Sequence, residues 1–434
     1  MKTAVIIGGG LAGLFSAKLL VKKGFKVKII DNSKKLGGLI SSIKIKNYYF
    51  DHGSHIAQET TNKEVNKILF VNEKKNFHSY KFLPQDHYFN NRYYRNSPFL
   101  NINLLEKKKY LKAFSQILKN SSLSSLKFKN EKQRCELIYG KDLTNEIFEP
   151  LLKKKTGFKL SSLPPYSKEK FNLSKIIAGD NKITDKLKKN SHYNEILAFN
   201  SYRKGVTGRK NLYPKKKGIN NLVDLFLTKS FLSKVSIMLD EKINSIKIKN
   251  DKIENIKTNK KNIKADLFIW TGNIITLNSL IYKKKQITNN KKFYWNFYHY
   301  LSNKLLKKNI FYSYIYDKDT PIHRVTFYDN FQKKNDKKKK FRFTVEYISP
   351  EKKLDPNLIN NEIISYLKKI KIIKDTSKVK LVQNYNVPIS FNSKKTNLDK
   401  NISKLKNLMI CGQASGEFSK QKIVLDIYDK ISKI

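Results

Sequence analysis

The sequence predicts an α/β protein in which a parallel, nucleotide-binding sheet carries an inserted second domain. An apolar run at residues 4–7 leads directly into a glycine-rich turn at residues 8–13. This order of strand, turn and helix is typical of a dinucleotide-binding βαβ unit. The chain has 434 residues, of which 39% are hydrophobic, and this is enough for two or three folding units with a substantial core.

The glycines of the turn have distinct predicted roles. Gly8 allows the tight turn out of the strand, Gly10 lets backbone amides approach a pyrophosphate, and Gly13 lets the helix pack closely against the sheet. The N–H groups of the first helical turn, which includes Leu11 and Ala12, favour a negatively charged ligand. We therefore expect the pyrophosphate of a dinucleotide at this helix N-terminus.

The rest of the unit follows in order along the chain. Apolar residues at helical spacing over 14–20 predict a helix that Gly24 ends. The alternating segment 25–31 predicts a second strand. Its last residue, Asp31, is placed where a carboxylate accepts the ribose hydroxyls of an adenine nucleotide. Because all the parts occur in sequence, a glycine turn without a ligand is a poor alternative.

Two segments just downstream indicate which dinucleotide binds. Gly37 and Gly38 follow the second strand, and segment 50–55 reads Phe-Asp-His-Gly-Ser-His. Both resemble the flavoprotein superfamily that holds amine oxidases, protoporphyrinogen and phytoene-type oxidoreductases, and UDP-galactopyranose mutases. The resemblance implies FAD, with the glycine pair beside its pyrophosphate and segment 50–55 passing the isoalloxazine ring. The cofactor contacts implied in this segment are Gly53, Ser54 and His55.

Later segments extend the resemblance over nearly the whole chain. Segment 213–222 resembles the part that returns to the FAD domain, with Lys216 or Lys217 where a glycine is usual. After it, the resemblance implies that the backbone of Ile243 faces the adenine. Near the C-terminus, Gly412 ends an apolar strand, and the acid that usually follows and meets the ribityl-phosphate arm is replaced by Gln413, whose neutral amide can still form hydrogen bonds.

The resemblance also implies a domain organisation. A Rossmann-like FAD-binding domain of the glutathione reductase type would comprise three separate segments, 1–80, 205–285 and 385–434. An inserted α+β substrate domain would comprise residues 81–204 and 286–384. Within it, residues 80–200 are expected to be mostly helical, and strands rich in Tyr and Phe are expected at 311–316, 323–328 and 341–348. In the first domain, apolar alternation around Asn250 and Asp251 predicts a hairpin.

The formal net charge of +54 would ordinarily suggest nucleic acid or anionic lipid. The lysines, however, are spread along the chain in short runs such as 107–109 and 153–155. We interpret most of this charge as solvated surface, with a peripheral contact to an anionic membrane as the alternative, and we do not expect nucleic acid. Segment 104–118 predicts an amphipathic helix with a basic face, and an ordinary packed helix is favoured over a membrane-surface helix.

Arginines are few against this lysine background. An arginine binds a carboxylate or phosphate through two parallel hydrogen bonds, which lysine cannot copy, so each is expected at a specific geometric site. Segment 316–327 resembles a substrate-domain strand of galactopyranose mutase-like proteins, which implies that Arg324 contacts a diphosphate. The alternative is a salt bridge to a buried acid such as Glu346. The seven arginines are Arg92, Arg95, Arg134, Arg203, Arg209, Arg324 and Arg342.

The resemblance places His55 near the flavin, where it would carry protons; the alternative is a hydrogen bond to backbone that shapes the loop. The implied function is a FAD-dependent oxidoreductase of the amine oxidase and protoporphyrinogen oxidase-like group, in which the flavin N5 accepts a hydride from a small molecule. One alternative is a UDP-galactopyranose mutase-like enzyme of surface-polysaccharide biosynthesis, with the reduced flavin as nucleophile. The other is a non-catalytic flavin-binding protein.

The remaining features of the sequence concern other possible cofactors and the cellular location of the protein. A second Gly-x-Gly-x-x-Gly unit is not found, so we do not expect a nicotinamide domain, and no cluster has the spacing of a metal site. Two cysteines, Cys135 and Cys411, suit a reducing compartment. The first strand begins close to residue 1, which argues against a secretory signal, and no apolar run is long enough to span a bilayer. We expect a cytoplasmic or membrane-peripheral protein.

Overall fold

The computed structural model describes residues 1–53, 55–119, 127–201, 209–282, 291–332, 340–391, 400–416 and 419–434. The chain divides into two compact units, each built from separate segments. Unit 1 comprises residues 1–80, 209–288 and 395–434, and unit 2 comprises residues 81–208 and 289–394. The last boundary lies later than the expected residue 385, because strand β21 (Val379–Phe391) pairs along its length with β17 of unit 2.

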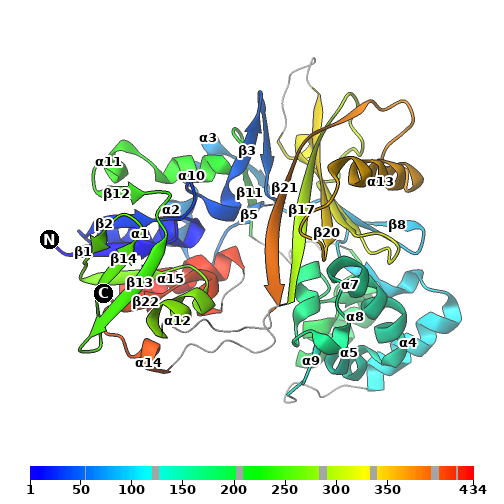
Figure 1. The fold of residues 1–434 in the computed structure, drawn as a ribbon. Coiled ribbons are helices and arrows are strands. Elements are labelled where there is room, and N and C mark those ends of the chain that lie inside the picture. The colour runs from blue at the N-terminus through cyan, green and yellow to red at the C-terminus, as the bar shows by residue number, and fades with distance from the viewer. Residues whose placement is uncertain are drawn as a thin grey trace. The chain divides into compact units, whose positions relative to one another are not determined.

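Unit 1 is organised around a five-stranded sheet in the order β12-β2-β1-β16-β22, with every pair parallel (Figure 1). The strands are β1 (Thr3–Ile7), β2 (Lys26–Ile30), β12 (Val235–Met238), β16 (Leu267–Trp270) and β22 (Leu408–Ile410). Their apolar runs are mostly buried, as expected for a parallel sheet covered on both faces. The predictions of a strand at 25–31 and of an apolar strand before Gly412 are therefore confirmed.

Two layers cover this sheet. Helix α1 (Leu11–Lys22) packs against α10 (Asn220–Phe226) and α15 (Lys420–Ser432). The other layer is an antiparallel sheet of β13 (Ile243–Lys249), β14 (Lys252–Thr258) and β15 (Asn262–Ile263), whose isoleucines share a core with β1 and β16. The predicted hairpin is confirmed: Asn250 and Asp251 both have positive φ, 50° and 55°, as a two-residue hairpin turn requires.

Shorter elements complete unit 1. A hairpin of β3 (Ser42–Ile45) and β4 (Tyr48–Asp51) follows the second strand, and a second small sheet has the order β5-β11-β6. That sheet joins residues distant in sequence, since β11 pairs with β6 at Leu212 and Ser79. The remaining elements are β5 (Ala57–Gln58), β6 (Phe77–Tyr80), β11 (Asn211–Pro214), α2 (Lys63–Leu69), α3 (Glu73–Asn76), α11 (Lys229–Leu232), α12 (Ile274–Tyr282) and α14 (Lys400–Ser403).

Unit 2 contains a seven-stranded sheet in the order β21-β17-β20-β19-β18-β7-β8. One face packs against α13 (Pro356–Lys369) through an apolar core that includes Val325, Val345, Ile363 and Leu367 (Figure 1). The three strands predicted from Tyr and Phe content are confirmed as β18 (Tyr312–Ile315), β19 (Ile322–Phe327) and β20 (Phe341–Ser349). The long strand β17 (Lys291–Ser302) lies between β20 and β21.

The expectation that residues 80–200 are mostly helical missed a hairpin. Strands β7 (Gln85–Phe89) and β8 (Arg92–Arg95) are joined by Asn90 and Asn91, whose φ angles are 50° and 60°. Asparagine tolerates this left-handed region better than most residues. The other elements are α4 (Lys107–Lys119), α5 (Glu131–Tyr139), α6 (Lys141–Leu143), α7 (Glu149–Thr156), α8 (Asn181–Leu187), α9 (Ser191–Ile196), β9 (Leu100–Asn101) and β10 (Ile176–Ile177).

Across the described residues, no helix is both long enough and apolar enough to cross a bilayer.

Candidate dinucleotide-binding site

Helix α1 begins in unit 1 with an N-terminus that no side chain caps. Its N-cap is Gly10, and the first helical hydrogen bond is donated by Leu14 N to Gly10 O at 3.0 Å. The N–H groups of a first helical turn have no carbonyl within the helix to bind. They also lie at the positive end of the helix dipole. The start of α1 therefore suits an anionic ligand.

Most glycines of this region are required by the packing of the protein itself. A Cβ on Gly8, whose φ is +107°, would lie 2.3 Å from the Thr271 hydroxyl oxygen. On Gly13 it would lie only 1.8 Å from the Gly8 carbonyl oxygen. Gly37, with φ of +109°, would meet Val223 at 2.9 Å. These glycines would be needed with or without a ligand.

Gly10 differs from them. Its φ is −77°, which any residue adopts, and a Cβ there would meet nothing closer than the Gly37 carbonyl oxygen at 3.9 Å. A Cβ on Gly38 would likewise make only an ordinary contact, with Gly10 Cα at 3.6 Å, although the φ of +52° at Gly38 itself favours glycine. The structure thus leaves room over Gly10 that its own side chains do not fill. Room of this kind is what a pyrophosphate needs to approach the backbone closely.

The carboxylate of Asp31 holds the backbone beside this space over Gly10. One carboxylate oxygen accepts a hydrogen bond from Gly9 N at 2.6 Å, and the other accepts one from Ser33 N at 2.7 Å. The first bond holds the glycine turn against the end of β2. Each carboxylate oxygen has a second lone pair, so a ribose hydroxyl can be bound as well.

The buried carboxylate of Asp51 connects distant segments of unit 1, and we call this set of hydrogen bonds the Asp51 clasp. Asp51 lies in the segment that resembles flavoproteins, but the sequence does not predict its partners. The side chain is 1% exposed and accepts three hydrogen bonds, from Ser42 Oγ at 2.7 Å, Tyr213 OH at 2.7 Å and Ile219 N at 3.0 Å. The carboxylate therefore ties strand β4 to the segment that begins α10. Two of these partners lie more than a hundred residues away in the chain.

The clasp also bears on the glycine pair. Val223 of α10 contacts Gly37, because a Cβ on that glycine would meet its side chain. Ser42, itself bonded to Asp51, accepts a hydrogen bond from Asn220 N at 3.0 Å. Segment 37–42 and the start of α10 thus hold each other in place beside Gly10.

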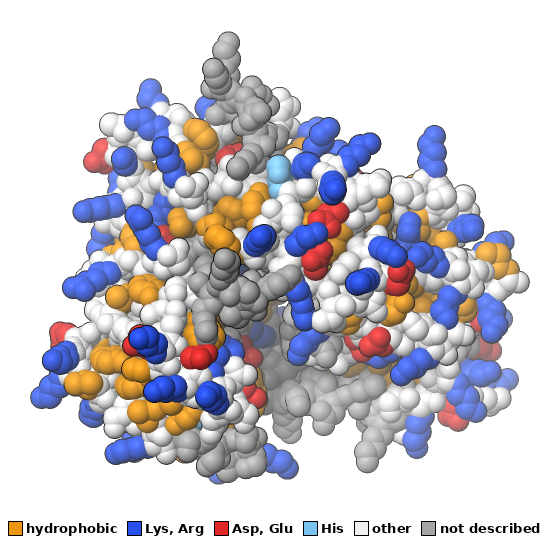
Figure 2. Space-filling view, turned by 180° about the vertical axis from the view of Figure 1, so that it is seen from behind, with side chains coloured by type: hydrophobic (Ala, Val, Ile, Leu, Met, Phe, Trp, Pro, Cys, Tyr) orange, Lys and Arg blue, Asp and Glu red, His pale blue; other side chains and the backbone are white. Residues whose placement is uncertain are grey.

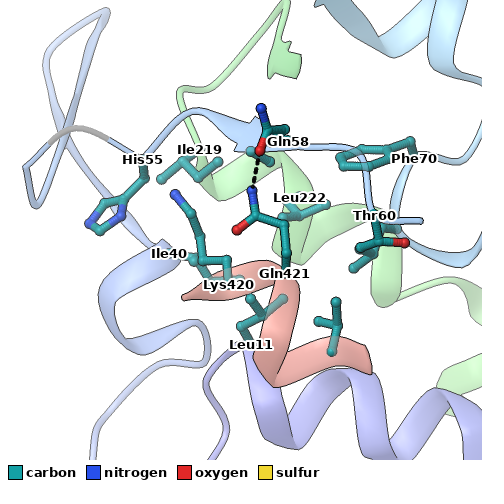
Figure 3. Close-up of a pocket in the computed structure, with 13 residues that line it drawn as sticks. Leu11, Ile40, His55, Gln58, Thr60, Phe70, Ile219, Leu222, Lys420 and Gln421 are labelled. Carbon is teal, nitrogen blue, oxygen red and sulfur yellow. Dashed lines mark hydrogen bonds between the residues drawn. The ribbon is translucent and has the colours of Figure 1, made fainter. Parts of the chain in front are cut away.

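A small pocket opens next to the start of α1 (Figure 3). Three polar contacts surround it: His55 Nε2 donates to the His52 carbonyl at 2.7 Å, Lys420 Nζ to the Ile56 carbonyl at 2.9 Å, and Gln421 Nε2 to Gln58 Oε1 at 3.0 Å. Leu11 and Ile40 also line it. Gln58, Lys420 and Gln421 carry no sequence motif, and only the fold brings them to His55.

His55 therefore forms a hydrogen bond to backbone, which is compatible with either of its two predicted roles. With Nε2 bearing the proton, Nδ1 is the acceptor nitrogen of the neutral ring. Neighbouring His52 is buried, and burial together with the charge of Lys35 lowers its pKa to about 4. His52 is thus neutral near pH 7.

The other predicted contacts lie as follows. Gly53 has φ of +88° in the turn after β4, and Ser54 lies outside the described residues. Ile243 is the first residue of β13 and pairs with Thr258. Gly412 has φ of +71°, and a Cβ on it would lie 3.0 Å from the Ala12 Cβ, so the C-terminal segment packs on the first turn of α1. Gln413 follows in a short 3-10 helix.

In unit 2, Arg324 adopts the alternative arrangement rather than presenting an open fork. Its Nε and one terminal nitrogen donate to the Glu346 carboxylate at 2.8 and 3.1 Å, and the other terminal nitrogen donates to Tyr314 OH at 2.9 Å. Trp295 Nε1 also donates to Glu346, at 2.9 Å. The two parallel donors that would bind a diphosphate are occupied by a buried acid of the same sheet.

The remaining arginines divide by burial. Arg134 pairs with Glu131 at 3.2 Å and Glu169 at 3.1 Å, and Arg342 pairs with Asp329 at 2.8 Å. Arg134, Arg342 and Arg324 thus each form ion pairs with acids of unit 2. Arg92, Arg95 and Arg209 have exposed side chains, and their geometric role stays a prediction; Arg203 lies outside the described residues.

The interpretation of the lysine run 153–155 as solvated surface is wrong for Lys155. It is fully buried, and its ammonium donates to the carbonyls of Ile322 at 2.5 Å and Ile315 at 3.4 Å. Burial lowers its pKa to about 7, with Asp317 acting in the opposite direction. Helical spacing was an available signal, because Leu151 precedes Lys155 by four residues and is also buried.

Two further groups concern reactivity. Burial raises the pKa of the Cys411 thiol to about 12, which keeps it protonated and unreactive near pH 7. Within the part of the chain that the structure describes, no group of three His, Cys, Asp or Glu side chains is arranged to hold a metal ion.

Comparison with known proteins adds sequence likeness at the N-terminus. Residues 6–70 match the family of NAD(P)-binding Rossmann-like domains. A 1-hydroxycarotenoid 3,4-desaturase of Flavobacterium sp. (strain P99-3) is 43% identical over 53 residues, 12% of this chain and 11% of the relative. A probable flavin-containing monoamine oxidase A of Dictyostelium discoideum is 43% identical over 49 residues, 11% of each chain. The chain thus matches only about a tenth of these relatives.

Likeness of fold extends over the whole chain. A reduced UDP-galactopyranose mutase superposes with a TM-score of 0.73 at 14% identity, covering 100% of this chain and 93% of the mutase. A putative protoporphyrinogen oxidase from Exiguobacterium sp. 255-15 gives a TM-score of 0.65 at 12% identity, with 100% and 98% covered. The predicted fold class is confirmed: the chain is an α/β protein with a Rossmann-like domain, and it resembles the amine oxidase and protoporphyrinogen oxidase-like superfamily with features of UDP-galactopyranose mutases.

Proposed function

We propose that unit 1 binds FAD and that the protein is a FAD-dependent oxidoreductase acting on a small molecule. The observation that carries the proposal is the space over Gly10, a glycine that the protein's own packing does not require, at an uncapped helix N-terminus. Gly38 borders the same space. The likeness to a flavin-containing monoamine oxidase in the N-terminal segment supports a flavin.

The residues are assigned as follows. Backbone N–H groups at Leu11 and Ala12 would bind the pyrophosphate, and Asp31 would accept a ribose hydroxyl. The backbone of Ile243 would meet the adenine. Bound FAD would supply a flavin N5 that accepts a hydride. The groups assigned to the pyrophosphate and flavin end are Gly8, Gly13, Gly37, Gly38, Gly53, Ser54, His55, Gly412 and Gln413.

His55 would hold or move a proton beside the flavin. Its bond to the His52 carbonyl fixes the ring orientation, and this bond defines which nitrogen is the proton acceptor. Replacing His55 with Gln keeps a hydrogen-bond donor but removes the titrating group. We expect kcat to fall at least tenfold while the affinity for flavin stays at the wild-type value. If kcat and flavin affinity fall by the same factor, His55 only shapes the loop.

Two glycine variants test the cofactor site. Gly10→Ala adds a Cβ that meets no protein atom closer than 3.9 Å, so the apoprotein should keep its Tm while FAD binding weakens at least tenfold. Gly13→Ala places a Cβ 1.8 Å from the Gly8 carbonyl, so it should destabilise the apoprotein itself. The measurements are thermal unfolding and titration of the apoprotein with FAD. Unchanged FAD affinity in Gly10→Ala would overturn the site.

The purified protein distinguishes the remaining choices. A flavin spectrum, followed by chromatography of the nucleotide released on denaturation, identifies FAD rather than a nicotinamide dinucleotide. Oxygen uptake or dye reduction with amines or porphyrinogens supports the oxidoreductase. A protein that binds flavin but whose flavin no substrate reduces would be a non-catalytic flavin-binding protein.

A flavin-dependent sugar-nucleotide mutase is the second candidate, favoured by the TM-score of 0.73 to a UDP-galactopyranose mutase. Against it, the arginine expected to hold the diphosphate is paired with Glu346. Under the mutase hypothesis, UDP should quench protein fluorescence, and Arg324→Lys should weaken UDP binding at least tenfold. Absence of UDP binding to the reduced protein would remove this candidate.

A further inference from the structure

Helix α4 of unit 2 has two different faces. Ala113 and Ile117 are buried, so the predicted packed helix is confirmed on this side. Leu111 and Leu118, seven residues apart and therefore on one face, are 53% and 39% exposed. In Figure 1, α4 lies at the outer edge of the helices of its unit. The helix thus presents two leucines to solvent.

Unpaired lysines flank these leucines. Lys109 and Lys112 form ion pairs with Glu146 at 3.1 Å and Asp142 at 2.8 Å. Lys107, Lys108 and Lys119 are exposed and form no ion pair with any residue that the structure describes. The outward face therefore combines exposed leucine side chains with positive charge that the protein does not neutralise.

Lysines are spread over the visible surface in Figure 2, but two other exposed leucines of the described chain lack this setting. The most exposed leucine of the described chain, Leu358 at 68%, lies near Asp355 and Glu362 in the sequence of α13, which are acidic. Leu232, 43% exposed, ends the four-residue helix α11, which is too short to offer an amphipathic face.

We propose that the outward face of α4 docks on an anionic lipid bilayer. The lysines would lie at the lipid phosphates, and Leu111 and Leu118 would enter the headgroup boundary, as in interfacial helices. A folded protein partner would need a larger apolar surface than two leucines provide. Nucleic acid would use the lysines but gain nothing from the leucines.

Sedimentation of the full chain with vesicles tests this surface. Binding is expected with phosphatidylcholine vesicles that contain phosphatidylglycerol, but not with pure phosphatidylcholine, and it should weaken as salt rises. The triple variant K107Q/K108Q/K119Q should bind about a hundredfold more weakly, since each lysine at an anionic surface contributes about fivefold. Its matched control is K249Q/K252Q/K257Q, which removes the same charge from the exposed β13–β14 hairpin.

A second pair separates lipid insertion from charge alone. L111S/L118S should weaken vesicle binding about tenfold or more, whereas the control L232S/L358S should not change it. All four leucines are exposed, so both variants should keep the wild-type Tm. Equal effects of the two lysine variants would overturn the proposal, because general charge would then explain binding. So would unchanged binding of L111S/L118S, or binding of duplex DNA at lower protein concentration than anionic vesicles.

Discussion

The carboxylates of Asp31 and Asp51 in unit 1 bind different kinds of partner from those of Glu346 and Asp329 in unit 2. In unit 1, Asp31 accepts hydrogen bonds from two backbone N–H groups, and Asp51 accepts one from a backbone N–H and two from hydroxyl groups. In unit 2, Glu346 and Asp329 bind the side chains of Arg324 and Arg342. The two acids of unit 1 hold loop backbone, whereas Glu346 of unit 2 joins β20 to β19, and Asp329, in a 3-10 turn, binds Arg342 of β20.

This difference bears on where each unit can bind a ligand. In unit 1 the acids hold glycine-rich turns open around the start of α1, and the N–H groups at that helix end receive no side-chain cap. In unit 2, Arg134, Arg324 and Arg342 are already paired with acids. We therefore propose the dinucleotide site in unit 1, where the N–H groups at the start of α1 receive no side-chain cap.

The largest expected effect removes the acid of an arginine pair. Glu346→Gln leaves the buried Arg324 guanidinium without its countercharge, which should cost about 3–5 kcal/mol of unfolding free energy. Urea denaturation measures this cost, and Glu351→Gln on an exposed side chain is the control. If Glu346→Gln costs no more than the control, the buried pair is not what stabilises the strands of unit 2.

Asp51→Asn should have the next largest effect. The amide cannot match the charge that receives three donors, and we expect a loss of about 2–3 kcal/mol together with weaker flavin binding. Tyr213→Phe removes one of the donors and should cost about 1 kcal/mol. Denaturation and flavin titration of both variants would show the gradation. If Asp51→Asn keeps the wild-type affinity for flavin, the hydrogen bonds of Asp51 do not support the proposed binding site beside Gly10.

Lys155 gives unit 2 a pH dependence. Its folded-state pKa is lowered from 10.5 to about 7, so between these values the unfolded chain binds the proton more tightly. Stability from this group therefore rises as pH increases, by about 2 kcal/mol from pH 7 to pH 9. Lys155→Met should flatten this slope relative to wild type in urea denaturation at both pH values. Parallel slopes would show that Lys155 keeps an ordinary pKa.

The smallest effect concerns a strained loop of unit 1. Lys217 has φ of 57° at or next to the position where the resemblance expects glycine. Its ion pair with Asp224 is largely exposed and contributes little. Lys217→Gly should raise the unfolding free energy by about 0.5–1 kcal/mol. Lys216 does not have a positive φ, so Lys216→Gly should lower the unfolding free energy slightly. If Lys217→Gly lowers it too, the substitution relieves no backbone strain.

Much of the fold was predictable from sequence, whereas the polar partners were not. The turn after β1 and the β13–β14 hairpin have local causes, namely residues that tolerate positive φ between apolar runs. The hairpin at Asn90 and Asn91 has the same kind of signal, but it lies within a segment whose pattern predicts mostly helix. Gln58, Lys420 and Gln421 carried no local signal at all.

The sequence by itself determined the first βαβ unit, the acid at the end of β2 and the resemblance to flavoproteins, because turn conformation and helical period depend on neighbouring residues. Only the tertiary structure decided that Arg324 binds Glu346, that Asp51 binds Ile219, and that Lys155 is buried. Those outcomes depend on which strands and helices become neighbours. A side chain's partner and its solvation are properties of that packing.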